Sequence, residues 1–430
     1  MTHRSAANSR HTIDLFTAME KRLVDNCAQP GLLPIDDALA RLLGQISPLL
    51  ERETVDLASA LDRILAQTIS APINVPAGDN SAMDGYALRA QDSSLRVTLI
   101  GESLAGHPFS GELKPGQCVR IMTGALIPAG ADTVVMQENV RVEGESIWLS
   151  EPSPAGDNIR RAGEDIAFGS QVLEAGHRVN ALDIGLLASL GLAQLPVIRK
   201  IRVALLTTGD ELLLPGAALE AGKIYDSNRP LLRALLQRLP VELIDFGVIA
   251  DSPDALREAF ASAMTQADVV ISTGGVSVGD ADYTKTILAE LGEIHFWKIA
   301  MKPGKPFAFG RLGKGWFFGL PGNPVSTAVT YHQLVVPALR LLSGEVPVVS
   351  DVQTAIASHA LKKLPGRTDF QRGIFRHANG VNTVVGAGLQ SSGVLSAMTK
   401  ANCYIRLEAE RGAVAAGETV TIIPFDEFIR

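Results

Sequence analysis

Residues 267–285 read ADVVISTGGVSVGDADYTK, an apolar run that leads into a glycine-rich loop and then into acidic residues. Asp268 to Thr273 is β-branched and of strand length, which is typical of a central strand buried on both faces. A helix is predicted from about Asp282, because the following residues have apolar side chains at helical spacing and Asp282 can cap them. Strand, glycine loop and helix in this order form one unit of an α/β domain.

The glycine loop has the features of an anion site. Gly274, Gly275 and Gly279 permit positive φ and let backbone N–H groups approach a ligand, and Ser277 adds a hydroxyl donor. A phosphate at the start of the next helix would meet free amides and the positive end of the helix dipole. A turn with acidic caps would also account for the loop alone, so the neighbouring segments must decide.

Strands and helices alternate from Ile201 onward. The segments are predicted in this order: strand IRVALLTT, helix NRPLLRALLQRL, strand VELIDFGVIA, helix SPDALREAFASAM and strand DVVIST. Ser252 is the expected N-cap of the second helix and Pro253 its first residue. This alternation predicts right-handed β-α-β units and a mostly parallel sheet covered on both faces.

The remaining segments predict a multidomain α/β plus β protein. Short β-rich runs separated by glycine and proline fill the second domain, and the chain after Gly344 is again β-rich, which indicates a small barrel or sandwich. The expected parts are a lead-in (1–30), a mixed, discontinuous first domain (31–72 and 160–200), a β-rich second domain (73–159), the central α/β domain (201–346) and a C-terminal β-barrel-like domain (347–430).

Three local elements are predicted outside the α/β domain. They are a helix over residues 35–50, a second helical piece with a short strand over 55–69, and a buried helix plus strand over 181–198.

Composition limits the classes of function. The chain has 430 residues, 46% hydrophobic and 20% charged, and a net charge of −7, which gives no general support for binding nucleic acid or an anionic membrane. Cys27, Cys118 and Cys403 are scattered without CxxC spacing, so neither a disulfide framework nor a cysteine zinc site is expected. The polar opening lacks the apolar core of a secretory signal. We therefore expect a cytoplasmic protein without a membrane span.

Acidic residues follow each of the three predicted parallel strands. Glu211 follows the first, Asp251 the second and Asp282 the third. Carboxylates at a phosphate site are explained if a hard cation such as Mg²⁺ bridges carboxylate and phosphate oxygens. For Asp251, its position beside a helix cap is an adequate alternative explanation.

Two further loops supply positive charge and a helix start. Lys298, Lys302 and Lys305 lie in WKIAMKPGKPFAFG, and three lysines in a proline-fixed loop at a strand end favour a phosphate or oxyanion clamp. In WFFGLPGNPVST, Asn323 is the expected N-cap and Pro324 the first residue of a long helix. A purely structural cap is sufficient to explain Asn323.

Other polar residues carry little signal alone. Asp84 and Thr123 lie in loops of the β-rich domain and Asp165 lies in an acidic turn, where polar residues are common. His295 and His332 lie in apolar elements and are expected to be satisfied core or edge residues. Neither a Walker loop nor a GxGxxG fingerprint is present, which disfavours an ordinary kinase or dehydrogenase.

Taken as an ordered set, the motifs resemble a known family. They are DNSAMDGYA, RIMTGA, ADTVVMQE, RRAGEDI, TTGDEL, GKIYDSNR, STGGVSVGDADYTK, KPGKPFAFG and LPGNP. This set, over about residues 35–430, resembles the molybdopterin molybdenumtransferases of the bacterial MoeA type, which are related to the gephyrin E domain. The resemblance implies four domains per chain, one of them molybdopterin-binding, and a homodimer whose cleft joins the two subunits.

The resemblance also implies a reaction and its residues. Adenylylated molybdopterin and molybdate would be the substrates, and Mg²⁺ would assist cleavage of the phosphoanhydride with release of AMP. Glu211, Asp251 and Asp282 would position metal and pterin phosphate, and Lys298 and Lys302 would stabilise the oxyanion. The other matching positions are Asp84, Thr123 and Asp165, contributed from the partner subunit, the loop residues Pro321 and Pro324, and Ser392 in LQSSG.

Two rival interpretations remain open. The adenylyltransferase of the same pathway would use the same α/β domain to join ATP and molybdopterin, but it would not need the extra β-rich domains. A scaffold, as in the gephyrin relatives, would be favoured by a disordered linker or a fused partner domain, and neither is evident. Beyond a second copy of the chain, the expected partners are other proteins of molybdenum cofactor biosynthesis.

Overall fold

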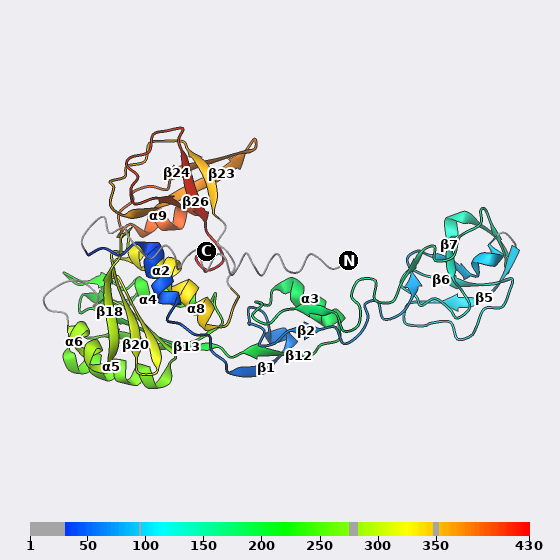
Figure 1. Cartoon of the computed structure of the whole chain (residues 1–430), viewed down its shortest axis with the longest axis horizontal. Coiled ribbons are helices and arrows are strands. Elements are labelled where there is room, and N and C mark those ends of the chain that lie inside the picture. Colours follow the sequence, from blue (N-terminus) through cyan, green and yellow to red (C-terminus); the bar gives the residue numbers. More distant parts are fainter. Residues whose placement is uncertain (1–30, 94–95, 275–282, 347–351) are drawn as a thin grey trace. The chain divides into compact units, whose positions relative to one another are not determined.

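The computed structural model describes residues 31–93, 96–274, 283–346 and 352–430 (Figure 1). Contacts divide the chain into two units, one of residues 1–51 and 198–430 and one of residues 52–197. The second unit is therefore inserted into the first, and each is described by itself below.

A six-stranded sheet forms the centre of the first unit, in the order β16-β13-β17-β21-β20-β18. The first four strands of that order are parallel, and the last two are antiparallel to their neighbours. The mostly parallel sheet predicted from the alternation is thus confirmed. The strands are β13 (Ile201–Thr208), β16 (Val241–Ile249), β17 (Val269–Thr273), β18 (Gly292–Lys298), β20 (Pro306–Leu312) and β21 (Gly315–Leu320). A short parallel pair, β14 (Leu212–Leu213) and β15 (Ile224–Tyr225), lies outside it.

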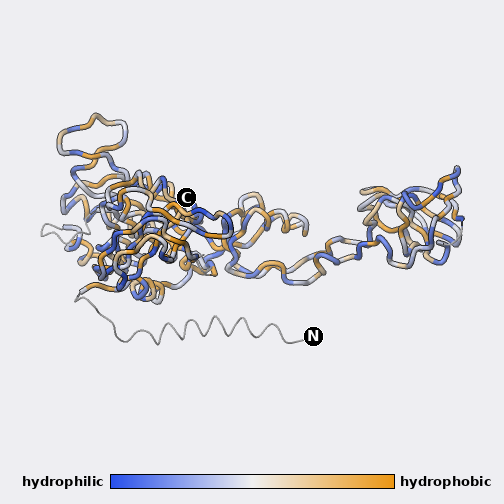
Figure 2. Tube along the Cα trace, turned by 90° about the horizontal axis from the view of Figure 1, so that it is seen from above, coloured by the Kyte–Doolittle hydropathy of each residue, from blue (hydrophilic) through white to orange (hydrophobic). Residues whose placement is uncertain are grey.

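Helices cover both faces of this sheet because side chains alternate along each buried strand. Val203 and Leu205 of β13 pack in one core with α2, α4, α7 and α8, while Ala204 and Leu206 pack in the other with α5 and α6. Hydrophobic and hydrophilic segments alternate along the trace of this unit (Figure 2). The helices are α2 (Ile35–Leu43), α4 (Asn228–Leu236), α5 (Pro253–Gln266), α6 (Tyr283–Leu291), α7 (Pro324–Thr330) and α8 (Val336–Leu342).

Helix boundaries agree with the sequence where capping chemistry is explicit. The Ser252 hydroxyl accepts a bond from the amide of Ala255 and Pro253 is the first residue of α5, which confirms both predictions. Residues 324–342 form one helical run, as expected, but with a π turn at Tyr331–Val335. Pro337 follows that turn, and since proline has no N–H it cannot continue the regular ladder of bonds.

Two predictions made for the residues before the inserted unit and at its start were wrong in part. The helix expected over residues 35–50 ends at Leu43, where Gly44 follows, and it packs against the α/β core rather than with residues 160–200. The helical piece expected over residues 55–69 is absent. That segment holds the end of β1 (Arg52–Asp56), a single 3-10 turn (Leu57–Ser59) and the start of β2 (Ile69–Ser70), because its apolar residues serve strand pairs and bridges instead.

The C-terminal part is a closed five-stranded barrel, in the order β23-β24-β22-β26-β25 with β25 pairing back to β23. Full closure leaves no free sheet edge among these strands. The short β19 (Met301–Lys302) adds to this barrel by pairing with β23. Its elements are β22 (Gln353–Ala357), β23 (Thr368–Ala378), β24 (Val381–Gly386), α9 (Leu395–Lys400), β25 (Cys403–Leu407) and β26 (Thr419–Pro424).

The second unit contains a β-rich part and a mixed part. A six-stranded sheet runs in the order β7-β4-β6-β5-β9-β8, and the pairs β1-β12, β2-β11 and β3-β10 lie outside it with helix α3. The elements are β3 (Asn80–Ser81), β4 (Gly85–Leu88), a 3-10 turn (Ala90–Asp92), β5 (Arg96–Ser103), β6 (Gln117–Ile121), β7 (Thr133–Met136), a 3-10 turn (Gln137–Asn139), β8 (Val140–Glu143), β9 (Ser146–Leu149), β10 (Ile159–Arg160), β11 (Gln171–Leu173), α3 (Ala181–Ser189) and β12 (Gln194–Ile198). Within the described ranges of both units, no helix combines the length and apolar character needed to cross a bilayer.

The substitution Gly274→Ala should destabilise the α/β domain strongly. Gly274 has φ +84°, and a Cβ there would lie 2.5 Å from the carbonyl oxygen of Thr208. Gly222→Ala is the matched control, because its φ is +80° with no atom within 4 Å of the added Cβ. We expect a loss of about 1–2 kcal/mol for the control and at least twice that for Gly274→Ala in urea unfolding. Equal losses would show that the close approach to Thr208 has no energetic weight.

Candidate functional site

The loops that carry the predicted carboxylates leave the sheet at one edge. Because β13, β16, β17 and β21 are parallel and adjacent, the residues after Thr208, Ile249, Thr273 and Leu320 all emerge at their carboxyl ends. Ligands of open α/β sheets bind outside this edge. The structure therefore brings the first two acidic loops, the start of the glycine loop and the LPGNP loop to one side of the α/β domain.

Buried hydroxyl groups without partners line the ends of the two central strands. Thr207 and Thr208 close β13, and Ser272 and Thr273 close β17. All four are at most 4% exposed, and their hydroxyl oxygens have no hydrogen-bond partner. A buried polar group without a bond costs about 1–3 kcal/mol, so four at one edge favour a polar partner there, either water or a ligand.

Two buried residues near this edge were not singled out from the sequence. Asp226 accepts the amides of Asn228 and Arg229 at the start of α4, and the Asn228 side chain donates to the carbonyl of Gly322 at 2.7 Å. The second carboxylate oxygen of Asp226 and the amide oxygen of Asn228 are buried without partners. The GKIYDSNR motif did indicate polar contacts at this position, since polar residues between a strand and the start of a helix favour bonds to nearby backbone amides.

The two described carboxylates predicted at a metal site, Glu211 and Asp251, are exposed. The amide of Asp251 donates to Asp210 at 3.1 Å, which joins the loops after β13 and β16. Gly209 has φ +145°, and a Cβ there would lie 2.6 Å from a carboxylate oxygen of Glu211, so Glu211 folds over this glycine. Oxygen donors from adjacent loops fit a hard cation. Among the residues that the structure describes, however, no group of three possible ligands is assembled.

Only part of the glycine loop lies within the described residues. Gly274 adopts positive φ, as a ligand-approaching glycine does. The other predicted residues of the loop, Gly275, Ser277, Gly279 and Asp282, lie outside the described ranges.

The lysine loop is held between three parts of the first unit. The carbonyl of Lys298 accepts the amide of Leu33, and the amide of Ile299 donates to the carbonyl of Lys305, which closes the loop. Lys302 lies in β19, and its ammonium group is 3.8 Å from the buried carboxylate of Asp369 on β23. All three lysine side chains are exposed, so the loop presents positive charge to solvent.

The LPGNP loop meets a segment of the barrel domain. Pro324 is the first residue of α7 and Asn323 occupies the cap position, but the Asn323 side chain makes no capping bond. The carbonyl of Pro321 accepts the Thr327 hydroxyl at 2.5 Å. The carbonyl of Ser392 accepts the amide of Val325 at 3.1 Å, so this helix start already has one amide occupied by protein.

In the second unit, Asp84 and Thr123 are brought together. A carboxylate oxygen of Asp84 accepts the amide of Thr123 at 2.7 Å and its hydroxyl at 2.8 Å. These bonds, the amide first, lower the pKa of Asp84. Asp165 is exposed in a neighbouring turn that Asp79 holds by accepting from Arg161 and from the amide of Ala162.

The histidines behave as expected. His332 is buried and bonds to Asp426 at 2.9 Å, so it is a satisfied core residue. His295 lies exposed on β18, which is an edge strand of the central sheet.

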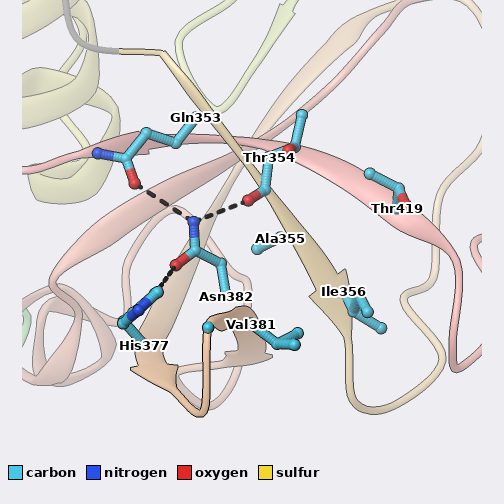
Figure 3. Close-up of a pocket in the computed structure, with 9 residues that line it drawn as sticks. Gln353, Thr354, Ala355, Ile356, His377, Val381, Asn382 and Thr419 are labelled. Atoms are coloured by element: carbon cyan, nitrogen blue, oxygen red, sulfur yellow. Dashed lines mark hydrogen bonds between the residues drawn. The ribbon is translucent and has the colours of Figure 1, made fainter.

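A separate groove of about 490 Å³ opens on the barrel between β22 and β24 (Figure 3). The Asn382 side chain spans it, donating to the carbonyl of Thr354 at 3.1 Å and bonding to His377 at 2.8 Å. None of the predicted site residues lines this groove.

Comparison with known proteins identifies the family. Three family models match in order: the MoeA N-terminal region (domain I and II) over residues 33–191, a probable molybdopterin binding domain over 204–341, and the MoeA C-terminal region (domain IV) over 354–425. The chain belongs to the MoeA family of molybdopterin molybdenumtransferases.

Relatives in this MoeA family span the chain. The molybdopterin molybdenumtransferase of Haemophilus influenzae is 48% identical over 93% of this chain and 100% of its own, and that of Nostoc sp. is 35% identical over 92% and 93%. A crystal structure of the molybdopterin biosynthesis MoeA protein of Pyrococcus horikoshii is 30% identical, with a TM-score of 0.79 over 92% of this chain and 100% of that one. The family resemblance and the multidomain fold predicted from the motifs are thus confirmed, and the chain is a transferase.

The contact between Thr123 and Asp84 predicts a pH-dependent loss of stability in Thr123→Val. The hydroxyl bond helps to keep the folded-state pKa of Asp84 low, so its contribution is present above the ordinary aspartate pKa of about 3.9 and is lost as the carboxylate protonates. The drop in Tm caused by Thr123→Val should therefore be larger at pH 7 than at pH 3. Thr123→Ser keeps the hydroxyl and should show little drop at either pH. An equal drop of Thr123→Val at both pH values would rule out the carboxylate as the partner that matters.

Proposed function

We propose that this transferase of molybdenum cofactor biosynthesis inserts molybdenum from molybdate into adenylylated molybdopterin, with Mg²⁺-dependent release of AMP. The observation that carries the proposal is the carboxyl edge of the central sheet. Exposed carboxylates after β13 and β16 lie at the same edge as four buried hydroxyls without partners. A ligand that has a polar ring system, such as a pterin, and a phosphate group fits such an edge.

Binding of the pterin substrate is assigned to neutral donors at this edge. Thr207 and Thr273, which are register partners on one face of the sheet, can turn their hydroxyl hydrogens toward polar atoms of the pterin or its phosphate, and Thr208 and Ser272 follow on the other face. Gly274, and with it Gly275, Ser277 and Gly279, would add backbone amides. These groups orient the substrate without adding charge that would repel a carboxylate-bound cation.

Compensation of the phosphoanhydride charge is assigned to the lysine loop. Lys298, Lys302 and Lys305 present ammonium groups from a loop closed by backbone bonds. Lys302 and Lys298 would stabilise the oxyanion that develops as the anhydride breaks. The pairing of Lys302 with Asp369 limits where that ammonium group can move, so its position before substrate arrives is restricted.

Glu211, Asp251 and Asp282 would hold the divalent cation, since carboxylate oxygens from adjacent loops are the donors that Mg²⁺ prefers. When bound, the cation would neutralise part of the negative charge on the phosphate oxygens. The chain's own carboxylates would set its position, because the amide of Asp251 donates to the carboxylate of Asp210 and so holds one loop against the other.

We infer that the active form is a cytoplasmic homodimer. Asp84 and Thr123, held together, and Asp165 lie in residues 52–197, and we assign them to the site of the partner subunit. The bond network of Asp84 keeps it ionised, as a group that positions a cation or a water molecule must be. Pro321, Asn323, Pro324 and Ser392 would shape the floor of the substrate site through the contact of Ser392 with α7. Other proteins of cofactor biosynthesis would supply the adenylylated substrate and receive the product.

The reaction itself gives the main test. Purified protein with adenylylated molybdopterin should release AMP only when both molybdate and Mg²⁺ are present, because molybdate is the co-substrate of the proposed reaction and Mg²⁺ compensates the charge of the anhydride. AMP is measured by chromatography. Consumption of ATP in the presence of molybdopterin and the absence of molybdate would instead identify an adenylyltransferase.

The carboxylates are tested by amide substitution. Glu211→Gln and Asp251→Asn should each lower kcat about 100-fold or more, since the amide keeps the shape and removes the charge that holds the cation. Asp254→Asn is the matched control, because Asp254 is a fully exposed carboxylate on α5. Circular dichroism should show the same fold in all three. Full turnover in both site variants would show that the site is misplaced.

A further inference from the structure

The lysine loop (residues 298–305) has a buried backbone and exposed lysine side chains. Ile299 and Met301 are fully buried, in the core that also contains Val329 of α7. Lys302 and Lys305, in contrast, are exposed. Apolar residues therefore hold the loop against the domain, while its charged groups remain available to a ligand.

Backbone bonds hold the first half of the loop. The amide of Leu33 donates to the carbonyl of Lys298 at 2.8 Å, and the amide of Ala300 donates to the carbonyl of Leu33 at 2.7 Å. The carbonyl of Ala300 accepts the amide of Thr368 at 2.8 Å, and β19 pairs with β23 just beyond. The first half is thus fixed from two sides.

The second half of the loop packs against α7 through Gly304. Gly304 is buried with φ +108°, and a Cβ built there would overlap the hydroxyl oxygen of Thr330, the last residue of α7. Thr330 is fully buried, and its hydroxyl has no hydrogen-bond partner among the described residues. The contact is therefore one of close packing. A side chain at residue 304 would force the loop and the helix apart by about 1 Å, since non-bonded heavy atoms rest at about 3.5–4 Å.

Helix α7 connects this contact to the candidate site. It begins at Pro324 in the LPGNP loop and has 7 residues, so Thr330 lies about 10 Å along the helix from that loop. The helix carries the LPGNP loop at its start and touches the lysine loop at its end. The depth of the contact at Gly304 therefore sets the spacing between the two loops.

We propose that Gly304 is a positioning residue: because it has no side chain, the lysine loop lies directly against Thr330, and this contact sets where Lys302 and Lys305 stand relative to the LPGNP loop. The role rests on the proposed function, in which the lysines compensate charge as the anhydride breaks. Displacing such a group by about 1 Å can cost as much as 100-fold in rate. The loss falls on turnover, because the compensation is needed in the transition state.

Kinetics in three backgrounds test the role in turnover. Gly304→Ala should lower kcat for AMP release at least about tenfold, with KM for the adenylylated pterin within about twofold. In a Thr330→Ala background the same change should lower kcat by no more than about threefold, because the oxygen that the new side chain would overlap is gone. In a Thr330→Ser background, which keeps the hydroxyl, the full loss should return.

Hydrogen exchange tests the contact without turnover. In Gly304→Ala the amides of Ile299 and Ala300 should exchange about tenfold faster, because both donate bonds that hold the loop. Gly417→Ala is the matched control for backbone strain, since Gly417 has φ +89° and no other part of the described chain lies within 4 Å of an added Cβ. It should leave both amides unchanged.

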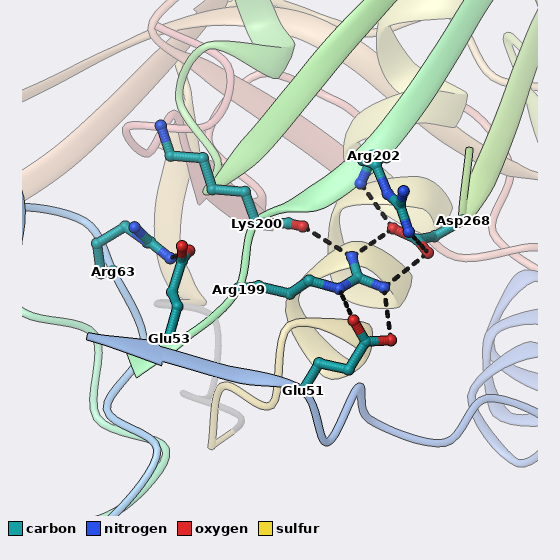
Figure 4. Close-up of polar contacts among 7 residues, drawn as sticks. All are labelled: Glu51, Glu53, Arg63, Arg199, Lys200, Arg202 and Asp268. Atoms are coloured by element: carbon teal, nitrogen blue, oxygen red, sulfur yellow. Dashed lines mark hydrogen bonds and ion pairs between the residues drawn. The ribbon is translucent and has the colours of Figure 1, made fainter. Parts of the chain in front are cut away.

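The amino end of the central sheet supplies the internal reference (Figure 4). There Asp268 accepts the amide of Arg202 at 2.8 Å and two bonds from the Arg199 guanidinium, at 2.7 and 2.9 Å. Exchange of the Arg202 amide should be the same in every variant. Equally faster exchange there would show that Gly304→Ala loosens the whole domain, and would overturn the proposal.

Three further results would overturn the proposal. Equal losses of kcat in the Thr330→Ala and Thr330→Ser backgrounds would show that strain at Gly304, and not the contact, is what matters. A raised KM with unchanged kcat would show that the loop binds substrate without positioning charge for the reaction. Unchanged exchange at Ile299 and Ala300 would show that the contact does not hold the loop.

Two other failures are distinguishable from these. If Gly304→Ala does not fold by itself, recovery of the folded protein with Thr330→Ala alone supports the contact, and failure in both backgrounds contradicts it. If the proposed reaction is wrong, the unmodified enzyme releases no AMP, and the exchange results still decide whether Gly304 holds the loop.

Discussion

The parallel pairing of β13 with β16 and β17, and of β17 with β21, is the constraint from which the site follows. It aligns four strand ends at one edge, so that loops more than a hundred residues apart in sequence emerge together. The pairing is close enough to favour glycine after β17, since a Cβ at residue 274 would lie 2.5 Å from the carbonyl oxygen of Thr208. The same closeness buries Thr207, Thr208, Ser272 and Thr273 and leaves their hydroxyls without a hydrogen-bond partner in the protein.

Charge at this edge is divided between separate elements. The carboxylates extend from the ends of the parallel strands, whereas the lysines come from the segment between β18 and β20, which includes β19 and pairs there with the barrel strand β23. The barrel contacts two of the candidate site's loops: β23 pairs with β19 and supplies Asp369 to Lys302, and Ser392 reaches the start of α7. A protein with the α/β domain alone would lack these contacts, which is the physical argument for the larger chain.

Much of this was predictable from sequence because the signals are local. The strand and helix order from Ile201, the cap at Ser252 and the positions of Glu211 and Asp251 after strands follow from periodicity and capping rules. The error over residues 55–69 has the opposite cause: its apolar residues pair with strands more than a hundred positions later, and no local pattern reports that. The same holds for the bond from the Asn228 side chain to the carbonyl of Gly322, and for the contact between Ser392 and Val325. Asp226, in contrast, accepts amides only two and three residues further on, which is a local contact. The limits of the four domains and the roles of the site residues stay predictions.

The central claim is that the carboxyl edge of the central sheet binds the pterin and its phosphate. A crystal structure of the protein soaked with adenylylated molybdopterin tests it most directly. The account predicts polar atoms of the ligand within hydrogen-bond distance of the Thr207 and Thr273 hydroxyls, with its phosphates facing Glu211 and the lysine loop. A ligand bound instead in the groove of the barrel, with those hydroxyls still unpartnered, would contradict it.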